Sequence, residues 1–487
     1  MKMQLSEIAR ALEIEAKETW EDITITSVSF DSRQLEPGAL FVPLIGEQDG
    51  HRYVQAALDN GASAVLWQAD HPETPTAIPA LVVEDTLVAL QALGRYYLQK
   101  INPKVVAVTG SNGKTTTKDM IAAVLSTQFN VQKTFANFNN EIGVPMTILS
   151  MEPNTEILVV EMGMDRFGQL DELSRLAQPD VAVITMIGEA HIEFFGTRDK
   201  IADAKMEIVN GLKEDGILIY NGDEPLLVKI ADAKMEIVNG LKEDGILIYN
   251  GDEPLLVERA AKIEQATFTF GNEPKDDLQG INVVSDATKS SFRVTLWPDE
   301  NFTIPMIGAY NVKNALAALS VGKEFMIDVA QMAKALENFD LTKNRTEWRT
   351  GTNDFMILSD VYNSNPTAAK EVLQAFAEVK VAGKRIAVLG DMLELGENER
   401  QMHASLAEVI DQNKISEVYL CGPLMESLAT ALQAKFDVDQ IHCYSPEQKE
   451  QLATDLLTKL TPDDAVLLKA SHGIHLEEVL TKIAKSE

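Results

Sequence analysis

Short apolar runs that end in glycine or an acidic residue alternate with helical patterns over most of the chain. "KVVAVTG", "EILVVEMG" and "VAVITMIG" are runs of this kind, and "KTTTKDMIAAVLSTQF" has helical periodicity. Continuous apolar strands that alternate with helices are typical of parallel sheets covered on both faces. We therefore predict an α/β protein whose ligands bind at the carboxyl ends of its strands.

The pattern changes twice along the chain and predicts three domains. Residues 1–99 predict a small mixed α/β domain, in which the turn signal Glu36-Pro37-Gly38 separates two apolar runs. Residues 100–339 predict a central domain with the parallel sheet of a P-loop ATPase, and "GAYNVKNALAALSVGKEF" near its end predicts a helix. Residues 340–487 resume the alternation in "FMILSD", "KRIAVLGD", "EVYLCG" and "AVLLKAS", and predict a Rossmann-like α/β domain.

One block of the central domain occurs twice. The 29-residue stretch 200–228, "KIADAKMEIVNGLKEDGILIYNGDEPLLV", recurs without a change at 229–257. Solenoid repeats diverge and need several units, so this pair is a very recent duplication or an artefact. Each copy predicts a helix, a turn and a strand, and only one copy fits a given slot in the sheet. We expect the fold to use the front of the first copy and the back of the second, and to extrude 29 residues between them.

Charge and cysteine content limit the classes of partner. The 43 basic and 74 acidic residues give a net charge of −31, which argues against nucleic acid or an anionic membrane surface as the main partner. The two cysteines, Cys421 and Cys443, have no metal-type spacing and fit a reducing compartment. The start "MKMQLSEIARAL" predicts an amphipathic helix rather than a signal peptide, and no apolar run approaches the roughly 20 residues of a membrane span. We expect a cytoplasmic monomer.

The strongest local signal for chemistry is "VTGSNGKTTTKD", which follows a strand and opens a helix. This is the context of a phosphate-binding loop. Gly110 and Gly113 let backbone N–H groups approach an anion, Lys114 supplies a cation near the terminal phosphates, and Thr115 can place a hydroxyl on Mg²⁺. Val108 stands where the full pattern has its first glycine. The alternative is a glycine-rich turn with an exposed lysine.

Further candidate residues follow strands of the same predicted sheet. Glu161 ends "EILVVE", and His191 follows "VAVITMIGEA". Each alone is more often an ordinary polar loop residue. Together they fall at the carboxyl ends of strands in the sheet that carries the phosphate loop, where a metal–nucleotide complex would lie. "TFANFNNEIGVP" adds neutral donors and acceptors at Asn139 and Asn140, or else is only a turn cluster.

The order of motifs along the chain resembles the Mur ligase family. The resemblance rests on "TGSNGKTTTKD", "NFNNEIGVP", "EMGM", "GEAHIEFFG", "AKMEI", "GAYNVKNALAA", "DVYNSNP" and "LGDMLELG". It covers the whole chain apart from one copy of the repeat, and the family has the same shortened phosphate loop. "YNSNP" stands where the branch that adds a single diamino acid has a "DNPR"-type signature, which favours the branch that adds a dipeptide.

This resemblance implies an activity, its cofactors and a role for each domain. The activity is ATP-dependent addition of D-Ala-D-Ala to UDP-N-acetylmuramoyl-tripeptide through an acyl phosphate, in peptidoglycan precursor synthesis. The cofactors are ATP, two Mg²⁺ ions and a carbamylated lysine. The first domain would bind the UDP substrate through "SFDSR" and "GEQDGHRY", the central domain ATP, and the third would close on ATP and bind the dipeptide. A Mur ligase that adds one amino acid, a folate-polyglutamylating relative and a non-catalytic nucleotide switch stay open as alternatives.

The resemblance also implies roles for individual residues. The catalytic set is Lys114, Glu161, His191 and Lys205. The ATP-binding set is Gly110, Ser111, Asn112, Gly113, Lys114, Thr115, Thr116, Asn311, Asn314, Arg345 and Asp360. The metal-binding set is Thr115, Glu161, His191 and Lys205 as its carbamate. The substrate-binding set is Ser32, Arg33, Asn139, Asn140, Asn363 and Asn365.

The repeat offers two lysines for the carbamate. In the family the lysine of "AK-x-E" reacts with CO₂, which requires an unprotonated, partly desolvated amine near a divalent metal. Lys205 and Lys234 both match, and without the resemblance either would be an exposed helix lysine. Lys205 lies fourteen positions after His191, which is the family spacing. We predict that Lys205 is functional and that Lys234 lies in the extruded segment.

Overall fold

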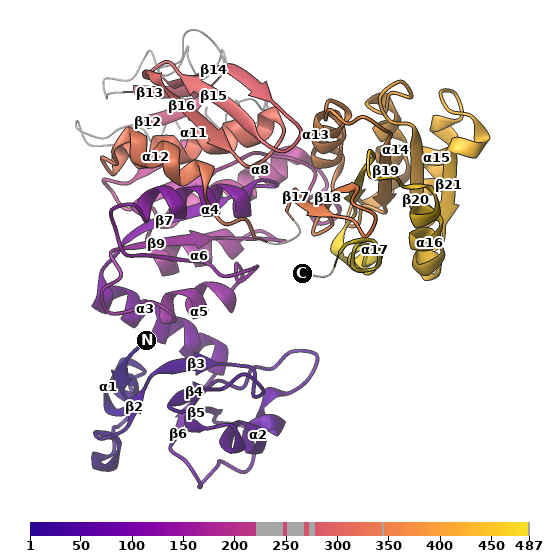
Figure 1. Ribbon diagram of the computed structural model, residues 1–487. Helices are drawn as coiled ribbons and strands as arrows, with labels where there is room; N and C mark the ends of the chain where they lie inside the picture. The colour runs from indigo at the N-terminus through magenta and orange to yellow at the C-terminus, as the bar shows by residue number, and fades with distance from the viewer. Residues whose placement is uncertain (221–246, 251–266, 272–277, 343–344, 486–487) are drawn as a thin grey trace. The chain divides into compact units, whose positions relative to one another are not determined.

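The computed structural model describes residues 1–220, 247–250, 267–271, 278–342 and 345–485 (Figure 1). The chain divides into two compact units. The first comprises Met1–Thr109, Gln128–Ala182 and Met206–Ile217, and the second comprises Gly110–Thr127, Val183–Lys205 and Leu218–Glu487. Within the described ranges, every helix is too short or too polar to cross a membrane.

The N-terminal part of the first unit contains a small parallel sheet. Its four strands lie in chain order: β3 (Ser27–Ser29), β4 (Ala39–Phe41), β5 (Ala62–Gln68) and β6 (Ala80–Val83). The predicted turn between two apolar runs is confirmed, with Gly38 at φ +93° just before β4. The other elements are β1 (Met3–Gln4), α1 (Leu5–Ala11), β2 (Thr24–Ile25), α2 (Val54–Asp59) and α3 (Thr86–Ile101).

The rest of the first unit contributes the strands that lead to the phosphate loop. These are β7 (Lys104–Thr109), β8 (Val131–Lys133) and β9 (Ile157–Glu161), which accompany α5 (Gly143–Leu149) and α6 (Gln169–Ala177). Every residue of β9 is buried, as expected for an apolar strand in a covered parallel sheet. β7 and β9 pair in parallel with Val108 opposite Glu161. Glu161 therefore lies beside the end of the strand that runs into the loop.

The second unit continues from that loop. Its elements before the third predicted domain are α4 (Lys114–Leu125), β10 (Val181–Ile184), α7 (Ile192–Phe195), α8 (Arg198–Met206), β14 (Leu278–Ser285), β15 (Ser290–Val294), β16 (Trp297–Ile304), α11 (Ala309–Glu324) and α12 (Val329–Glu337). β15 and β16 pair antiparallel, with Val294 opposite Trp297 next to the turn between them. The described strands of the large sheet have the order β16-β15-β14-β13-β12-β11-β10-β7-β9-β8.

The repeat enters this sheet twice, which corrects the expectation of an extruded block. The strand of the first copy is β11 (Ile217–Tyr220) and that of the second is β12 (Leu247–Asn250). They pair in parallel with Ile219 opposite Ile248, and β12 pairs in turn with β13 (Thr267–Gly271). Partners 29 positions apart occupy the same place in the two copies. Identical strands have identical pairing preferences, so the sheet admits a second one beside the first. Lys234 lies outside the described residues.

The C-terminal part of the second unit is a six-stranded sheet covered on both faces (Figure 1). Its order is β17 (Glu347–Thr350), β18 (Met356–Asp360), β22 (Ala465–Lys469), β19 (Arg385–Gly390), β20 (Glu417–Cys421) and β21 (Ile441–Tyr444). Alternate residues of β19 face different cores: Ala387 packs with α13 (Pro366–Ala377) and α15 (Glu426–Leu432), and Val388 with α16 (Lys449–Lys459) and α17 (Glu477–Ile483). The predicted α/β class with parallel sheets is confirmed. β21, "IHCY", was not predicted, because its polar side chains interrupt the apolar pattern.

Candidate active site

The phosphate loop has the predicted strand–loop–helix context, since β7 ends at Thr109 and α4 begins at Lys114. Gly110 has φ +147°, and a Cβ there would lie 1.9 Å from Thr185 Oγ1. Gly113 has φ +79°, and a Cβ there would lie 2.9 Å from Asn314 Oδ1. Both glycines are therefore required by backbone conformation and by space.

Hydrogen bonds fasten the loop to the segment that follows β10. Ser111 donates its backbone N–H to Met186 O at 2.8 Å and its hydroxyl to Gly188 O at 3.3 Å. The ammonium group of Lys114 donates to Gly110 O at 2.8 Å. This hydrogen bond holds the positive charge of Lys114 over the phosphate loop. An anion bound by the backbone N–H groups of the loop would therefore lie close to that charge.

Asn314 of α11 lies against this loop, and Asn311 lies one turn before it on the same helix. Asn314 Oδ1 contacts the position of Gly113, and Asn314 Nδ2 donates to Asn311 Oδ1 at 3.3 Å. Asn311 is buried and donates from Nδ2 to Ile307 O at 2.8 Å. The amide of Asn311 is thus used within its own helix and orients Asn314. Their contact with adenine stays a prediction.

Glu161 has one carboxylate oxygen that is engaged and one that is not. Asn139 Nδ2 donates to Glu161 Oε1 at 2.8 Å, and Glu161 N donates to Thr134 Oγ1 at 2.9 Å. Glu161 Oε2 is buried and has no hydrogen-bond partner among the described residues. A buried, unpartnered carboxylate oxygen is costly unless a cation balances it, so this side chain fits a metal ligand. Asn140 Oδ1 instead accepts from Gly143 N at 2.9 Å, where α5 begins.

Lys205 lies near the end of α8 with 1% of its surface exposed. Burial, and then the positive charge of Lys114, hold the pKa of the Lys205 amine well below its ordinary value. A lowered pKa increases the unprotonated fraction of the amine, which is the form that reacts with CO₂. The environment of Lys205 therefore favours the reaction, and the carbamate itself stays a prediction.

His191 is paired with a carboxylate that the sequence reasoning missed. Its Nδ1 lies 2.6 Å from Glu394 Oε2, and Glu193 N donates to Glu394 O at 3.1 Å. The side-chain hydrogen bond with His191 is the first cause of a lowered pKa of the Glu394 carboxyl group. Glu394 belongs to the motif "LGDMLELG". The sequence alone does not indicate that a residue of this motif lies next to His191.

The predicted residues before α13 form a charged cluster. The Arg345 guanidinium lies 3.9 Å from the ring centroid of Tyr362. Asp360 Oδ2 lies 2.8 Å from the ammonium group of Lys469, which also donates to Asn363 O. Lys469 was missed, yet a lysine at the end of the apolar strand "AVLLKAS" is a signal that could have found it.

The predicted UDP-binding residues Ser32 and Arg33 lie in the turn that follows β3 of the small sheet. Arg33 Nη2 lies 2.8 Å from Asp31 Oδ2 and Arg33 Nε donates to Asp31 Oδ1 at 2.9 Å, which fixes an exposed guanidinium. Ser32 is buried, and its carbonyl accepts from Asn60 Nδ2 at 2.8 Å. The hydrogen bond to Arg33 is the first cause of a lowered pKa of Asp31.

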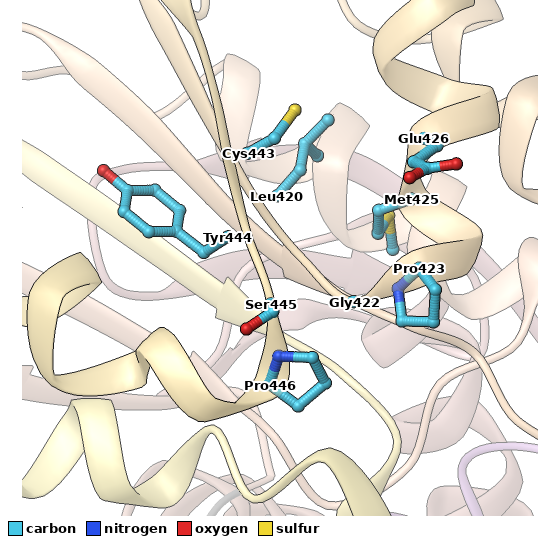
Figure 2. Close-up of a pocket in the computed structure, with 9 residues that line it drawn as sticks. All are labelled: Leu420, Gly422, Pro423, Met425, Glu426, Cys443, Tyr444, Ser445 and Pro446. Atoms are coloured by element: carbon cyan, nitrogen blue, oxygen red, sulfur yellow. The ribbon is translucent and has the colours of Figure 1, made fainter.

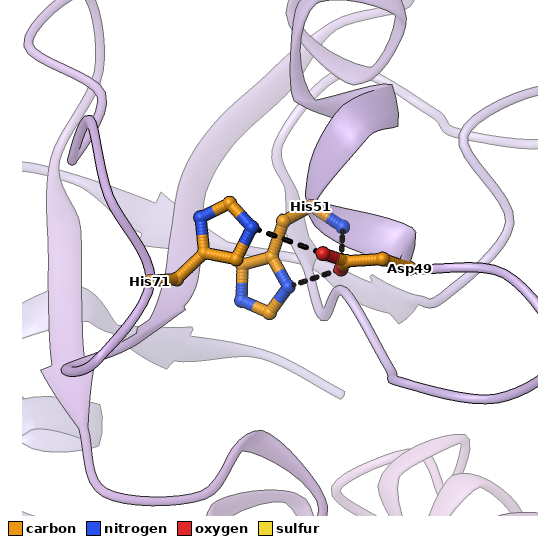
Figure 3. Close-up of side chains that lie close together, drawn as sticks. All are labelled: Asp49, His51 and His71. Carbon is orange, nitrogen blue, oxygen red and sulfur yellow. Dashed lines mark hydrogen bonds and ion pairs between the residues drawn. The ribbon is translucent and has the colours of Figure 1, made fainter.

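Asp49 and His51 of the "GEQDGHRY" loop cluster with His71 (Figure 3). Asp49 Oδ1 lies 2.8 Å from His51 Nδ1, and Asp49 Oδ2 lies 3.0 Å from His71 Nε2. Gln68 N donates to His51 Nε2 at 3.3 Å, so the proton of a neutral His51 is on Nδ1. A protonated Nδ1 cannot ligate a metal. The cluster is therefore a hydrogen-bonded clasp for the loop rather than a metal centre.

A pocket of about 350 Å³ lies at the carboxyl ends of β20 and β21 (Figure 2). Its lining includes Met425, Cys443 and Tyr444 but none of the predicted site residues. Both cysteines of the chain are free. Asp391 accepts from the N–H groups of Leu424 and Met425, so the helix end beside the pocket is already capped.

Three family descriptions match consecutive parts of the chain. Residues 24–97 match "Mur ligase family, catalytic domain", residues 108–229 and 226–322 match "Mur ligase middle domain", and residues 344–472 match "Mur ligase, glutamate ligase domain". The middle domain is matched in two stretches that meet inside the duplicated region. This is the pattern expected when one copy of the repeat is surplus to the family's domain.

Curated proteins of one activity resemble the chain over nearly its full length. UDP-N-acetylmuramoyl-tripeptide–D-alanyl-D-alanine ligase of Bacillus subtilis (strain 168) is 40% identical over 97% of this chain and 96% of that protein. The ligase of the same name from Escherichia coli (strain K12) is 31% identical over 84% of each chain.

Solved structures of such ligases have the same fold. MurF from Acinetobacter baumannii superposes with a TM-score of 0.80 at 26% identity and covers 99% of this chain and 98% of its own. MurF ligase from Thermotoga maritima, solved in complex with ADP, gives a TM-score of 0.72 at 30% identity over 94% of this chain and 96% of its own. The predicted three-domain α/β architecture is confirmed.

Proposed function

The chain belongs to the Mur ligase family, and on that premise we propose that it joins D-alanyl-D-alanine to UDP-N-acetylmuramoyl-tripeptide with ATP as the phosphoryl donor. It is an ATP-dependent carboxylate–amine ligase of peptidoglycan precursor synthesis. The observation that carries this function is the 40% identity to the Bacillus subtilis ligase over 97% of the chain.

The reaction requires activation of a carboxylate and its capture by an amine. The terminal carboxylate of the tripeptide attacks the γ-phosphorus of ATP, and ADP leaves as the acyl phosphate forms. The amine of D-alanyl-D-alanine then attacks the acyl carbon, loses a proton, and expels inorganic phosphate. An enzyme nucleophile is unnecessary, so the protein's contribution is to position the reactants and to balance charge.

The phosphate loop binds the triphosphate. Backbone N–H groups at the start of α4 and the ammonium group of Lys114 supply donors and positive charge. Gly110 and Gly113 allow the backbone to approach the phosphates. Asn314, oriented by Asn311, then binds the adenine end from α11.

The donors on this chain fit Mg²⁺. The unpartnered Glu161 Oε2 is the observation that supports a cation, and hydroxyl and carboxylate oxygens are the ligands that Mg²⁺ prefers. Thr115, Glu161 and His191 would hold it. When bound, Mg²⁺ balances the charge that develops on the transferred phosphoryl group.

We assign the carbamate to Lys205. The unprotonated form of its buried amine attacks CO₂, a C–N bond forms and one proton is released, so a neutral amine becomes an anion. An anion here would supply the second Mg²⁺ with a ligand. Incubation with ¹³C-bicarbonate followed by ¹³C NMR of the protein tests the assignment: a carbamate resonance is expected in the wild type and its persistence in Lys205→Ala would exclude Lys205.

We place the reaction in the cytoplasm. Support comes from the two free cysteines and from the need for ATP. Fractionation of cells that express the chain at natural levels tests this placement.

Release of ADP tests the function directly. ADP is expected only when ATP, UDP-muramoyl-tripeptide and D-alanyl-D-alanine are all present, together with a product whose mass equals the two joined substrates minus water. L-Lysine in place of the dipeptide should give no product. Product with L-lysine would identify a ligase for single amino acids, and ATP turnover without the tripeptide would identify a nucleotide switch.

A further inference from the structure

Every backbone N–H group in the first turn of α13 has an acceptor. Pro366 has no N–H, Thr367 N donates to Glu189 Oε2 at 3.2 Å, and Ala368 N donates to Asn365 Oδ1 at 3.0 Å. Ala369 N donates to Asn365 O at 2.9 Å. The N–H groups that a helix normally offers to an anion are thus used by the chain itself. This helix end is built for docking rather than for binding phosphate.

One docking contact comes from the phosphate loop. Asn112 Nδ2 donates to Asn365 Oδ1 at 3.2 Å, and Asn365 Nδ2 donates to Asn112 Oδ1 at 2.8 Å. The two amides satisfy each other although the residues are 253 positions apart in the chain. Asn365 is 1% exposed, so this reciprocal pair is shielded from water, where it is strongest.

The other contact comes from the segment after β10. Glu189 Oε1 accepts the hydroxyl of Thr367 at 3.0 Å and lies 3.5 Å from Arg198 Nη1. Arg198 Nη2 donates to Ile187 O at 2.8 Å, which orients the guanidinium. Arg198 begins α8, the helix that carries Lys205. The same turn of α13 is therefore held by the loop that binds the triphosphate and by the helix of the carbamate lysine.

We propose that Asn112 and Glu189 are positioning residues that dock the first turn of α13 and so fix the segment 360–365 for the ligation step. Asp360 and Asn363 lie in this segment, and Lys469 links them. The side chain of Asn112 acts through Asn365 and its amide is occupied by that partner, so its loss affects turnover rather than nucleotide affinity. That this step is ligation rests on the proposed function. The docking contacts themselves do not depend on it.

A double-mutant cycle tests the amide pair. Serine is a good N-cap but is too short to span the pair, so Asn365→Ser keeps the acceptor for Ala368 N while it removes the contact with Asn112. We expect Asn112→Ser and Asn365→Ser each to lower kcat about tenfold with KM for ATP within about twofold, and the double variant to fall no further. Asp328→Ser, a matched N-cap change at α12, should leave kcat unchanged.

An additive loss of about a hundredfold in the double variant would overturn the proposal, since independent sites add. An equal loss in Asp328→Ser would do the same. Hydrogen exchange of residues 366–370 in the full chain with ADP gives a readout that needs no ligation. Asn112→Ser should speed exchange at Thr367 and Ala368, which Asn112 does not touch. Unchanged exchange rates at Thr367 and Ala368 would contradict the docking proposal. A wild-type protein that does not ligate would contradict only the proposed function.

Discussion

At the scale of single residues, the environment decides which of many polar side chains can do chemistry. Glu161 and Lys205 are both about 1% exposed, and each is in a state that burial alone would make costly. The carboxylate has an oxygen without a partner, and the amine has a pKa held low by burial and by Lys114. A divalent cation would balance the carboxylate, and reaction with CO₂ would convert the unprotonated amine into a carbamate anion that can also ligate a cation.

Replacement of Lys205 by alanine should therefore abolish most of the ligation. We expect Lys205→Ala to lose about a hundredfold or more in kcat, the size typical of a lost charge-stabilising group. Lys234→Ala, the same change at the same position of the second copy, is the matched control and should stay active. ADP release under saturating substrates measures both. The reverse pattern would assign the carbamate to the second copy.

Glu161→Gln should separate metal binding from stability. The amide cannot balance the cation, so we expect the Mg²⁺ concentration for half-maximal activity to rise about tenfold or more. The temperature of unfolding without Mg²⁺ should stay or rise, because a buried charge with an unpartnered oxygen has been removed. A Mg²⁺ titration of ADP release and thermal unfolding with EDTA measure the two effects. An unchanged Mg²⁺ requirement would exclude Glu161 as a ligand.

The hydrogen-bonded clasp of Asp49 should make part of the free energy of unfolding depend on pH in the acidic range. Hydrogen bonds from His51, first through its backbone N–H, lower the pKa of Asp49 to about 2 from 3.8. A carboxyl group with a lowered pKa adds stability that is complete above its unfolded pKa and is lost as pH falls towards the folded pKa. The stability gap between wild type and Asp49→Asn should therefore be constant from pH 7 to 5 and shrink between pH 4 and 2. Urea unfolding at each pH measures the gap, and a gap that grows on acidification would contradict the clasp.

Residue roles were predictable from sequence only where a local pattern carries them. The phosphate loop could be found because Gly110, Gly113 and Lys114 belong to one short motif in the sequence. The partners of His191 and Asp360, namely Glu394 and Lys469, lie more than a hundred positions away and only folding brings them together. No single-sequence pattern encodes such pairs, so these residues were missed.

At the scale of elements, the sequence predicted the buried parallel strands and long helices well and the repeat poorly. β7, β9, β10 and α4 lie where the apolar runs and the helical period placed them. The repeat was expected to be extruded because a sheet was assumed to have a fixed number of places. β12 instead pairs with both β11 and β13, which leaves no exposed strand edge at that point. Backbone pairing outweighed the expected preference for a loop.

Deletion of 229–257 should leave an active and equally stable enzyme. The first copy supplies Lys205 and α8. We expect kcat within about twofold of the parent and an equal unfolding temperature, because the strand that remains has the same residues as β12 and can pair with β13 in its place. Ligation assays and thermal unfolding of both chains provide the measurement. A deletion variant that folds but does not ligate would show that the second copy contributes to the site.

At the scale of the whole molecule, the protein has a net charge of −31, and the nucleotide substrates of the proposed reaction are also anions. The phosphate loop must attract them locally against a repulsive long-range field. Raising the ionic strength from 10 to 150 mM shortens the Debye length from about 30 to about 8 Å, which screens the field more than the contacts in the loop.

Added salt should therefore speed the capture of ATP. We expect kcat/KM for ATP to rise about two- to fivefold over this range of ionic strength at constant free Mg²⁺. D-Alanyl-D-alanine, which has no net charge at neutral pH, is the control, and its kcat/KM should be unaffected. A fall in kcat/KM for ATP would show instead that a local field of opposite sign guides the nucleotide to its loop.

The side-by-side placement of β11 and β12 has a genetic consequence. Removal of either copy yields the same polypeptide, in frame, since the copies agree at every position. The remaining strand would lie between β10 and β13. β11 is already the neighbour of β10, and β12, which has the same residues, is already the neighbour of β13. A single recombination between the two copies can therefore return the gene to one copy without leaving a scar in the protein.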